Sequence, residues 1–200
     1  MPPIYSVAVF CGSRLGNNPA FAAAAVALGT GLARAGMRLI YGGGKVGMMG
    51  VLADAALSAG GYVTGVIPEF LVGWEVAHPG LTEVVVVSSM HARKQRMAEM
   101  ADVFVMLPGG MGTLDETVEI LTWRQLRLHA KPVLLCDVAG SAIPLVAAVD
   151  AAITQGFSGP EIRTHFEQLD GPPATLARLN AMAPPPLTQP PPLARSTPGA

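Results

Sequence analysis

The hydrophobic pattern of this chain alternates between two kinds of segment. Short runs that are almost continuously apolar occupy residues 6–11, 37–41, 62–67, 82–87, 102–107 and 131–137. Between them lie longer segments, most of them rich in alanine and leucine, at residues 19–36, 46–60, 90–101, 113–129 and 141–156. The short runs predict strands that are buried on both faces, and the longer segments predict helices. Strict alternation of strand and helix predicts a doubly wound α/β domain, with a largely parallel sheet and helices on both faces.

Proline content divides the chain into two parts. From Gly171 onward proline accumulates, with three consecutive prolines at 184–186 and again at 190–192. Such a segment favours extended or disordered backbone and cannot pack a core. The sequence therefore predicts a single domain over residues 1–170, followed by a disordered tail over residues 171–200. A proline-rich ligand for a partner protein is the alternative interpretation of that tail.

Overall composition limits the partners of the protein. The chain has 200 residues, half of them hydrophobic, which is enough for one sizeable core. Its 13 basic and 14 acidic residues give a net charge of −1. This balance gives no bulk electrostatic reason to expect nucleic acid or an anionic membrane as a partner, so an anion site has to be built locally.

The two cysteines, Cys11 and Cys136, lie far apart in apolar runs. This placement indicates buried thiols in a reducing compartment, and not a disulfide framework or a metal site. The sequence shows neither a signal peptide nor an apolar run near the roughly 20 residues of a membrane-spanning helix. We therefore expect a cytoplasmic protein.

The clearest candidate for chemistry is the stretch PGGMGTLDE at residues 108–116, directly after a predicted strand. Its three glycines let the backbone turn sharply and approach a ligand closely. If a helix starts at Thr113, its free N–H groups and the positive end of its dipole form a site suited to phosphate. A capping box between Thr113 and Glu116 is the purely structural alternative, although it leaves the three glycines unexplained.

A second candidate is the stretch MHARK at residues 90–94, after the fourth predicted strand. Arg93 and Lys94 then lie in the first turns of a helix, where cations oppose the helix dipole. A bound anion would reverse that cost. The alternative is a solvated, charged helix face.

A third candidate is YGGGKVGMMG at residues 41–50, in which Gly42, Gly44 and Gly47 fit the G-x-G-x-x-G pattern. This pattern favours dinucleotide binding only weakly here, because it follows the second strand and not the first. Val46 after Lys45 excludes the P-loop pattern G-x-x-x-x-G-K-[ST]. The three lysines of the chain show no evident setting for pyridoxal phosphate.

Two of these stretches occur together in one protein family. Residues 108–116 match P-G-G-x-G-T-x-x-E, and residues 90–94 match M-H-x-R-K. In this respect the chain resembles the LOG family of cytokinin riboside 5′-monophosphate phosphoribohydrolases, many members of which carry the label lysine decarboxylase. The likeness continues at residues 11–13, 41–50 and 122–133.

The resemblance implies a Rossmann-like fold, a homodimer, and hydrolysis of the N-glycosidic bond of adenosine-type 5′-monophosphates to free base and ribose 5-phosphate. It implies no metal or other cofactor. By position, the catalytic arginine and glutamate of the family match Arg93 and Glu116. The matching substrate- and phosphate-binding positions are Gly109, Gly110, Gly112, Thr113, Lys94, Gly43 and Ser13.

This chain departs from the family pattern at two places. Arg14 stands where a second serine is usual, and residues 137–145 lack the usual aromatic residues. The choice between adenine and an N6-prenylated adenine therefore stays open. So do two other functions on such a scaffold: a nucleotide or molybdenum-cofactor carrier that does not use the pair Arg93 and Glu116 for catalysis, and an NAD(P)-dependent oxidoreductase.

Overall fold

The computed structural model describes residues 6–72 and 77–183, and its centre is one parallel β-sheet. The seven strands lie in the order β4-β3-β2-β1-β5-β6-β7, and each neighbouring pair is parallel. Their bounds are β1 Ser6–Phe10, β2 Arg38–Tyr41, β3 Val63–Pro68, β4 Glu83–Val87, β5 Val103–Met106, β6 Val133–Asp137 and β7 Glu167–Asp170. The predicted doubly wound α/β fold is confirmed.

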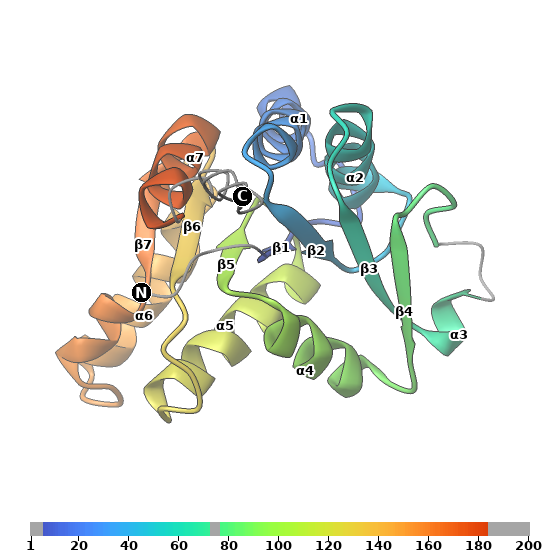
Figure 1. Ribbon diagram of the computed structural model, residues 1–200. Coiled ribbons are helices and arrows are strands. Elements are labelled where there is room, and N and C mark those ends of the chain that lie inside the picture. Colours follow the sequence, from blue (N-terminus) through green and yellow to red (C-terminus); the bar gives the residue numbers. More distant parts are fainter. Residues whose placement is uncertain (1–5, 73–76, 184–200) are drawn as a thin grey trace, which may run out of the picture.

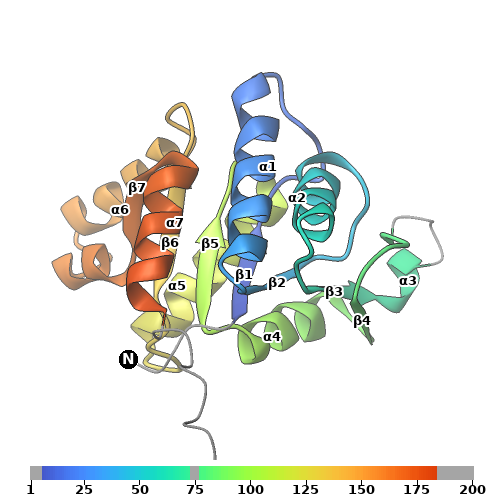
Figure 2. The same ribbon diagram turned by 45° about the horizontal axis from the view of Figure 1, so that its top comes forward.

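Helices cover both faces of this sheet (Figure 1). One face carries α1 Pro19–Arg34, α2 Gly47–Ser58 and α7 Gly171–Met182. The other face carries α4 Met90–Met100, α5 Met111–Gln125 and α6 Ile143–Thr154. A short helix, α3 Glu69–Val72, follows β3, and a 3₁₀ helix at Pro160–His165 precedes β7. The same three-layer arrangement is seen from above in Figure 2.

The direction of winding reverses between β1 and β5. From β1 the chain moves outward through β2, β3 and β4, and then returns to place β5 on the other side of β1. Phe10 and Met106, the last residues of these two strands, are register partners. Loops that leave the carboxyl ends of two such strands diverge, and they open a crevice in which doubly wound proteins bind ligands. The residues after β1 and after β5 are therefore the ones to inspect.

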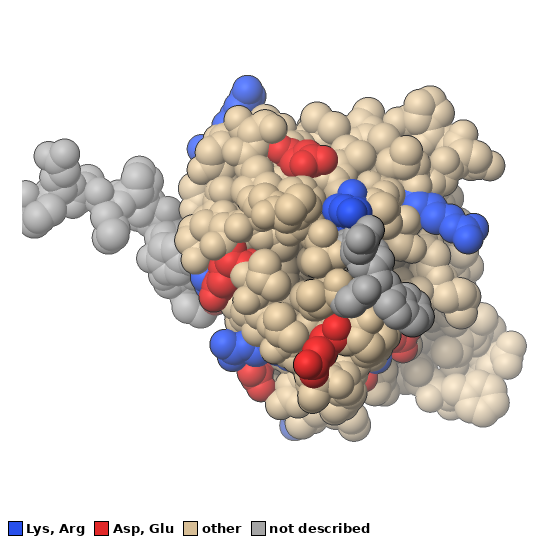
Figure 3. Space-filling model, turned by 90° about the vertical axis from the view of Figure 1, so that its right-hand side faces the viewer, with Lys and Arg blue, Asp and Glu red and all other residues tan. Residues whose placement is uncertain are grey.

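The prediction that every strand is buried on both faces was wrong for β4. This strand pairs only with β3, and Val84 and Val86 are about half exposed, at 48% and 54%. On this side of the molecule the charged side chains stand apart, with both signs intermixed, in a mostly uncharged surface (Figure 3). An edge strand is covered less completely than a central one, which gives β4 its alternating burial.

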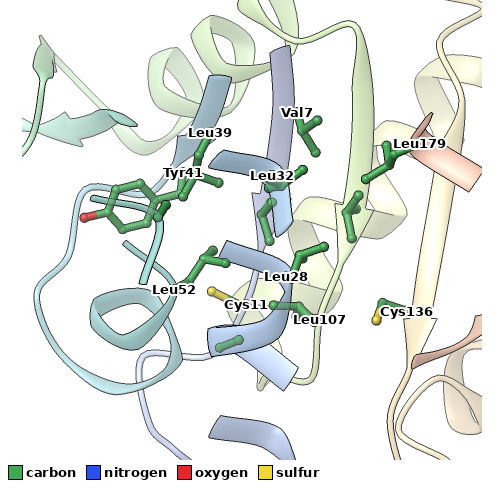
Figure 4. Close-up of a cluster of buried hydrophobic side chains, with 14 of the residues drawn as sticks. Val7, Cys11, Leu28, Leu32, Leu39, Tyr41, Leu52, Leu107, Cys136 and Leu179 are labelled. Atoms are coloured by element: carbon green, nitrogen blue, oxygen red, sulfur yellow. The ribbon is translucent and has the colours of Figure 1, made fainter. Parts of the chain in front are cut away.

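The larger of the two hydrophobic cores lies between the sheet and the layer formed by α1, α2 and α7. Figure 4 shows how Leu28 and Leu32 of α1, Leu52 of α2 and Leu107 after β5 converge there. Helices α1 and α2 approach closely at Gly29, where a side chain would overlap the carbonyl oxygen of Leu52. This core anchors the helices whose ends border the crevice.

The predicted tail over residues 171–200 was wrong in its first part. Residues 171–182 form α7, in which Leu179 and Met182 pack into the larger core. Pro172 and Pro173 lie within the first turn of the helix, where a missing N–H costs nothing, so proline there favours a helix start. Residues 184–200 lie outside the described residues. In the described part of the chain, no helix is long and apolar enough to cross a membrane.

Candidate functional site

A cavity of about 580 Å³ opens at the crevice between β1 and β5. Residues 12–16, which follow β1, form one wall, and residues 108–110, which follow β5, form another. Phe21 of α1, Met48 of α2 and Ser141, which precedes α6, complete the lining. Three of the predicted site residues, Ser13, Gly109 and Gly110, therefore line the same cavity although they come from two distant segments.

The glycine turn after β5 leads into an uncapped helix. The carbonyl oxygen of Pro108 accepts a hydrogen bond from the Gly12 N–H at 3.1 Å, which joins the two loops. Gly110 is the N-cap of α5, so no side chain satisfies the free N–H groups of the first turn, and that turn holds no acidic residue. A Cβ at Gly110 or Gly112 would meet no described atom within 4 Å. The turn thus presents free N–H groups and the positive end of a helix dipole to open space, as a phosphate site requires.

The capping box between Thr113 and Glu116 is not present. Helix α5 begins at Met111, so Thr113 is its third residue and not its N-cap. Thr113 is buried, and its hydroxyl lies so close to Gly109 that a side chain at Gly109 would overlap it. Because the helix starts two residues earlier than the sequence predicted, the side chain of Glu116 is free for another role.

That side chain forms an ion pair with Arg93 of α4. Arg93 Nη2 lies 3.4 Å from Glu116 Oε1, and the two residues are only 8% and 7% exposed. Arg93 Nε is buried and has no hydrogen-bond partner among the described residues. Buried polar groups are normally satisfied, so an unused guanidinium donor beside a carboxylate marks a site with spare hydrogen-bonding capacity.

Burial changes the pKa of Glu116 and of the nearby Cys11 thiol. Burial raises the pKa of Glu116 above its ordinary value, the positive charge of Arg93 opposes the rise, and the nearby Asp115 adds to it. Burial and the charge of Glu116 raise the pKa of the Cys11 thiol, which lies in the larger core (Figure 4). Cys11 is therefore a neutral thiol beneath the site, in agreement with the predicted buried cysteine.

Gly42, Gly43 and Gly47 of YGGGKVGMMG pack against protein atoms. A side chain at Gly42 would overlap the Arg93 guanidinium, and one at Gly47 would overlap the backbone of Ser13 and Arg14. Gly43, an expected binding residue, is buried with a positive φ of 76°, and a Cβ there would lie 3.1 Å from Ile67 Cβ. Sequence reasoning therefore missed Gly42 as the glycine that makes room for Arg93, since only the tertiary fold brings the two together.

Lys94 is engaged by two carboxylates of α5. Its Nζ lies 3.0 Å from Asp115 Oδ2 and 3.0 Å from Glu119 Oε2. Burial lowers the pKa of Lys94, but its hydrogen bonds to Glu119 and Asp115 outweigh that effect, so the pKa is raised. These ion pairs offset the cost of a cation near the start of α4. The sequence analysis had expected a bound anion to offset that cost. Lys94 thus links α4 to α5 through ion pairs.

The described residues hold no group of three or more His, Cys, Asp or Glu side chains that could bind a metal ion. Of the other two lysines, Lys45 is exposed, and Lys131 donates hydrogen bonds to the carbonyl oxygens of Ala98 and Glu99.

Comparison with known proteins identifies the family. Residues 49–179 match the family described as "Possible lysine decarboxylase". The chain is 47% identical, over 82% of its length and 83% of the relative's, to a cytokinin riboside 5′-monophosphate phosphoribohydrolase of Rhodococcoides fascians. This chain belongs to the LOG family. A cytokinin riboside 5′-monophosphate phosphoribohydrolase of Arabidopsis thaliana is 43% identical over 78% of this chain and 74% of its own length.

Solved structures share the fold of this LOG-family chain at lower identity. The molybdenum cofactor carrier protein of Chlamydomonas reinhardtii has a TM-score of 0.68 and 21% identity, over 90% of this chain and 98% of its own. The molybdenum cofactor binding protein of Rippkaea orientalis has the same TM-score and identity, and the same two shares of chain covered. At this identity the likeness concerns the fold alone.

Proposed function

We propose that this chain is a phosphoribohydrolase that cleaves the N-glycosidic bond of adenosine-type nucleoside 5′-monophosphates. Water adds to C1′ of the ribose, the C1′–N9 bond breaks, and the base leaves with the bonding electrons and takes up a proton. The products are free base and ribose 5-phosphate. The observation that carries the proposal is the buried pair of Arg93 and Glu116, one helical turn from an open and uncapped helix N-terminus.

The turn at residues 109–113, which we call the phosphate turn, holds the 5′-phosphate. Its backbone N–H groups donate to the phosphate oxygens, and the α5 dipole favours their negative charge. Gly110 and Gly112 leave the space that a phosphate needs, and Thr113 fixes the turn by packing against Gly109. Binding at a group remote from the reacting bond positions that bond, which is worth a large part of the rate enhancement.

Glu116 acts on the sugar. Cleavage of a ribosyl bond passes through a cationic, oxocarbenium-like sugar, by analogy with glycoside hydrolysis. A carboxylate with low solvent exposure stabilises that cation and directs the attacking water. Arg93 holds the Glu116 carboxylate in place, and its unused Nε donor is available to a substrate oxygen.

The alternatives have weaker support. The curated relatives at 43–47% identity are named phosphoribohydrolases, whereas the molybdenum cofactor carriers share the fold at 21% identity. A dinucleotide site would need an open glycine turn after β2, but Gly42, Gly43 and Gly47 are packed against protein. The lysines give the lysine decarboxylase label no support, because Lys94 and Lys131 are both engaged by protein groups and Lys45 is exposed.

Release of free base tests the proposal directly. AMP and isopentenyladenosine monophosphate are the substrates, and adenosine is the control without phosphate. We expect base release from the monophosphates only. Glu116→Gln should lower kcat roughly 10²- to 10⁴-fold, while Asp115→Asn, the same change at the neighbouring position, should leave most of the activity. Binding of AMP without any base release would favour the carrier, and an active Glu116→Gln variant would remove the assigned role of Glu116.

The pH dependence of kcat gives a second test of Glu116. The carboxylate form is the active one, so activity is lost as the pH falls through the pKa of Glu116. Because burial raises that pKa, the loss should occur at a higher pH than for an ordinary glutamate. Arg93→Ala removes the charge that lowers the pKa of Glu116, so it should move the acid limb to still higher pH. Asp115→Asn should move this loss of activity to lower pH. If neither substitution changes the pH at which kcat falls, the role of Glu116 is contradicted.

We also propose that the chain acts as a homodimer. Val84 and Val86 are exposed on β4, and the next exposed large apolar side chain along the sequence is Met90, which is 40% exposed at the start of α4. A second copy of this chain is the occupant that the resemblance to the LOG family implies. Val86→Asp should shift the mass in sedimentation from dimer to monomer, and Val26→Asp, an equally apolar exposed position on α1, should not. A monomeric unmodified chain would refute this proposal.

A cytoplasmic location is the last part of the proposal. The buried free thiols Cys11 and Cys136 support it, since such thiols suit a reducing compartment. Recovery of the protein from the extracellular fraction of its source cells would contradict it.

A further inference from the structure

Arg14 is a charged residue in the wall of the cavity that the phosphate turn borders. The remaining lining consists of glycine, serine, proline and apolar residues, so Arg14 alone among the lining residues brings a charge. Arg14 is exposed, and it forms no ion pair with any described residue. No carboxylate of the described part of the chain therefore occupies its guanidinium.

The loop that carries Arg14 is held against both glycine-rich turns. The Gly12 N–H donates to Pro108 O at 3.1 Å, and the Met49 N–H donates to Gly12 O at 3.3 Å. A Cβ at Gly12 would lie 3.3 Å from the Cα of Gly109, and Gly47 lies against the backbone of Ser13 and Arg14. Three glycines thus allow the loop at residues 12–14 to sit between the two turns. The backbone of residues 12–14 is therefore held beside the turn after β5, and Arg14 lines the cavity there.

A cation in this place raises the local positive potential. The α5 N-terminus already presents free N–H groups and a positive dipole end, with no acidic side chain in its first turn to offset them. Because Arg14 and the N-cap Gly110 line the same cavity, the guanidinium and the helix end both favour an anion bound in it. Planar guanidinium groups bind phosphate oxygens through two parallel N–H donors, which suits this anion best.

We propose that Arg14 binds the 5′-phosphate of the substrate and sets the preference of this enzyme for phosphorylated nucleosides. The inference rests on the proposed function, because it assigns a contact within the same site. The phosphate lies between the α5 N-terminus and the guanidinium, so the backbone supplies one side of the site and Arg14 the other. Glu116 and Arg93 act on the ribose and do not depend on Arg14.

The test is a comparison of Arg14→Ala and Arg14→Lys with Arg34→Ala. Arg34 is an exposed arginine in the last turn of α1, and the loop at residues 12–16 precedes the first turn of that helix. Its replacement therefore removes the same charge at the other end of α1. For Arg14→Ala we expect a KM for AMP raised roughly ten- to a hundredfold, the range for loss of a charge-assisted hydrogen bond. Because Arg14 does not touch the sugar, kcat should change much less, and Arg14→Lys should recover part of the loss.

A binding measurement separates this inference from the proposed function. Calorimetric titration with ribose 5-phosphate needs no turnover, and its Kd should rise with Arg14→Ala by the same factor as KM, whereas ribose without phosphate should show no such change. If the unmodified enzyme releases base from AMP but Arg14→Ala matches Arg34→Ala in both KM and Kd, the role of Arg14 is refuted and the proposed function stands. If no base is released yet ribose 5-phosphate binding depends on Arg14, the proposed function fails while the phosphate contact stands.

Discussion

The two glycine-rich turns of this protein look alike in sequence and differ in what surrounds them. In the turn after β2, Gly42, Gly43 and Gly47 each lie against protein atoms, and a side chain at any of them would meet a neighbour. In the turn after β5, Gly110 and Gly112 face open space. The first turn uses these glycines to let segments of the protein approach one another. In the second turn Gly109 packs against Thr113 in the same way, whereas Gly110 and Gly112 leave room for a ligand. Glycine content alone therefore does not identify a binding loop.

This comparison predicts that substitutions in the packed turn affect stability more than those in the open turn. The largest effect is expected for Gly47→Ala. Gly47 has a positive φ of 64°, and a Cβ there would overlap the Ser13 backbone, which cannot move aside as a flexible side chain could. We expect a loss of roughly 3 kcal/mol of unfolding free energy, or a Tm lower by roughly 6–12 °C.

Gly36→Ala is the matched control for that measurement. Gly36 has a similar φ of 68°, but a Cβ there meets nothing within 4 Å. Its replacement should cost only the backbone strain, about 1 kcal/mol. Equal losses for the two variants in thermal unfolding would mean that close packing at Gly47 contributes nothing.

Gly42→Ala tests the comparison more closely, because the neighbour that it displaces is Arg93, for which we propose a role in catalysis. The nearest atoms are the end of the Arg93 side chain, which can shift, so Tm should fall by no more than a few degrees. The shifted guanidinium no longer holds Glu116, and we expect kcat/KM to fall about a hundredfold, within the range for a misplaced catalytic group. In an Arg93→Ala background the same substitution should have little further effect. A full additional loss there would show that Gly42 acts independently of Arg93.

The smallest and opposite effect is expected for Gly112→Ala in the open turn. Alanine is the better helix former by up to about 1 kcal/mol, and no described atom lies within 4 Å of the new Cβ, so Tm should rise slightly. The added methyl group occupies the space beside the N–H groups of α5, and KM for AMP should rise roughly tenfold, or by about 1.4 kcal/mol. A variant with lower Tm and unchanged KM would reverse the assignment of the two turns.

The sequence predicted those parts of the site that are formed by residues close together in the chain, and it missed contacts between distant segments. The turn at residues 108–113 and the positions of Arg93 and Glu116 could be found because each motif is local, and its spacing survives in the linear chain. The capping box failed because the N-cap of the helix is Gly110, three residues before Thr113. Gly42 was missed because its contact with Arg93 joins segments about fifty residues apart, and no local pattern records such a contact.

The fold shows the same division. Strand and helix alternation was predicted because periodicity is a property of neighbouring residues. The exposed face of β4 was not predicted, because which strand becomes the edge depends on the order of strands in the sheet. Helix α7 was missed because its prolines suggested a tail, while packing of Leu179 and Met182 into the larger core stabilises a helix there.

By itself, then, the sequence determined the fold class, the turn proposed to bind phosphate and the residue types proposed to act on a sugar. These three features follow from hydrophobic periodicity and from the backbone chemistry of neighbouring residues, both of which can be read from the order of residues alone. Only the tertiary structure decided that Arg93 pairs with Glu116, that Lys94 is held by carboxylates, and that Arg14 stands in the wall of the cavity. Those outcomes depend on which strand ends meet at the reversal between β1 and β5, and burial there sets the charge and the open space of the site.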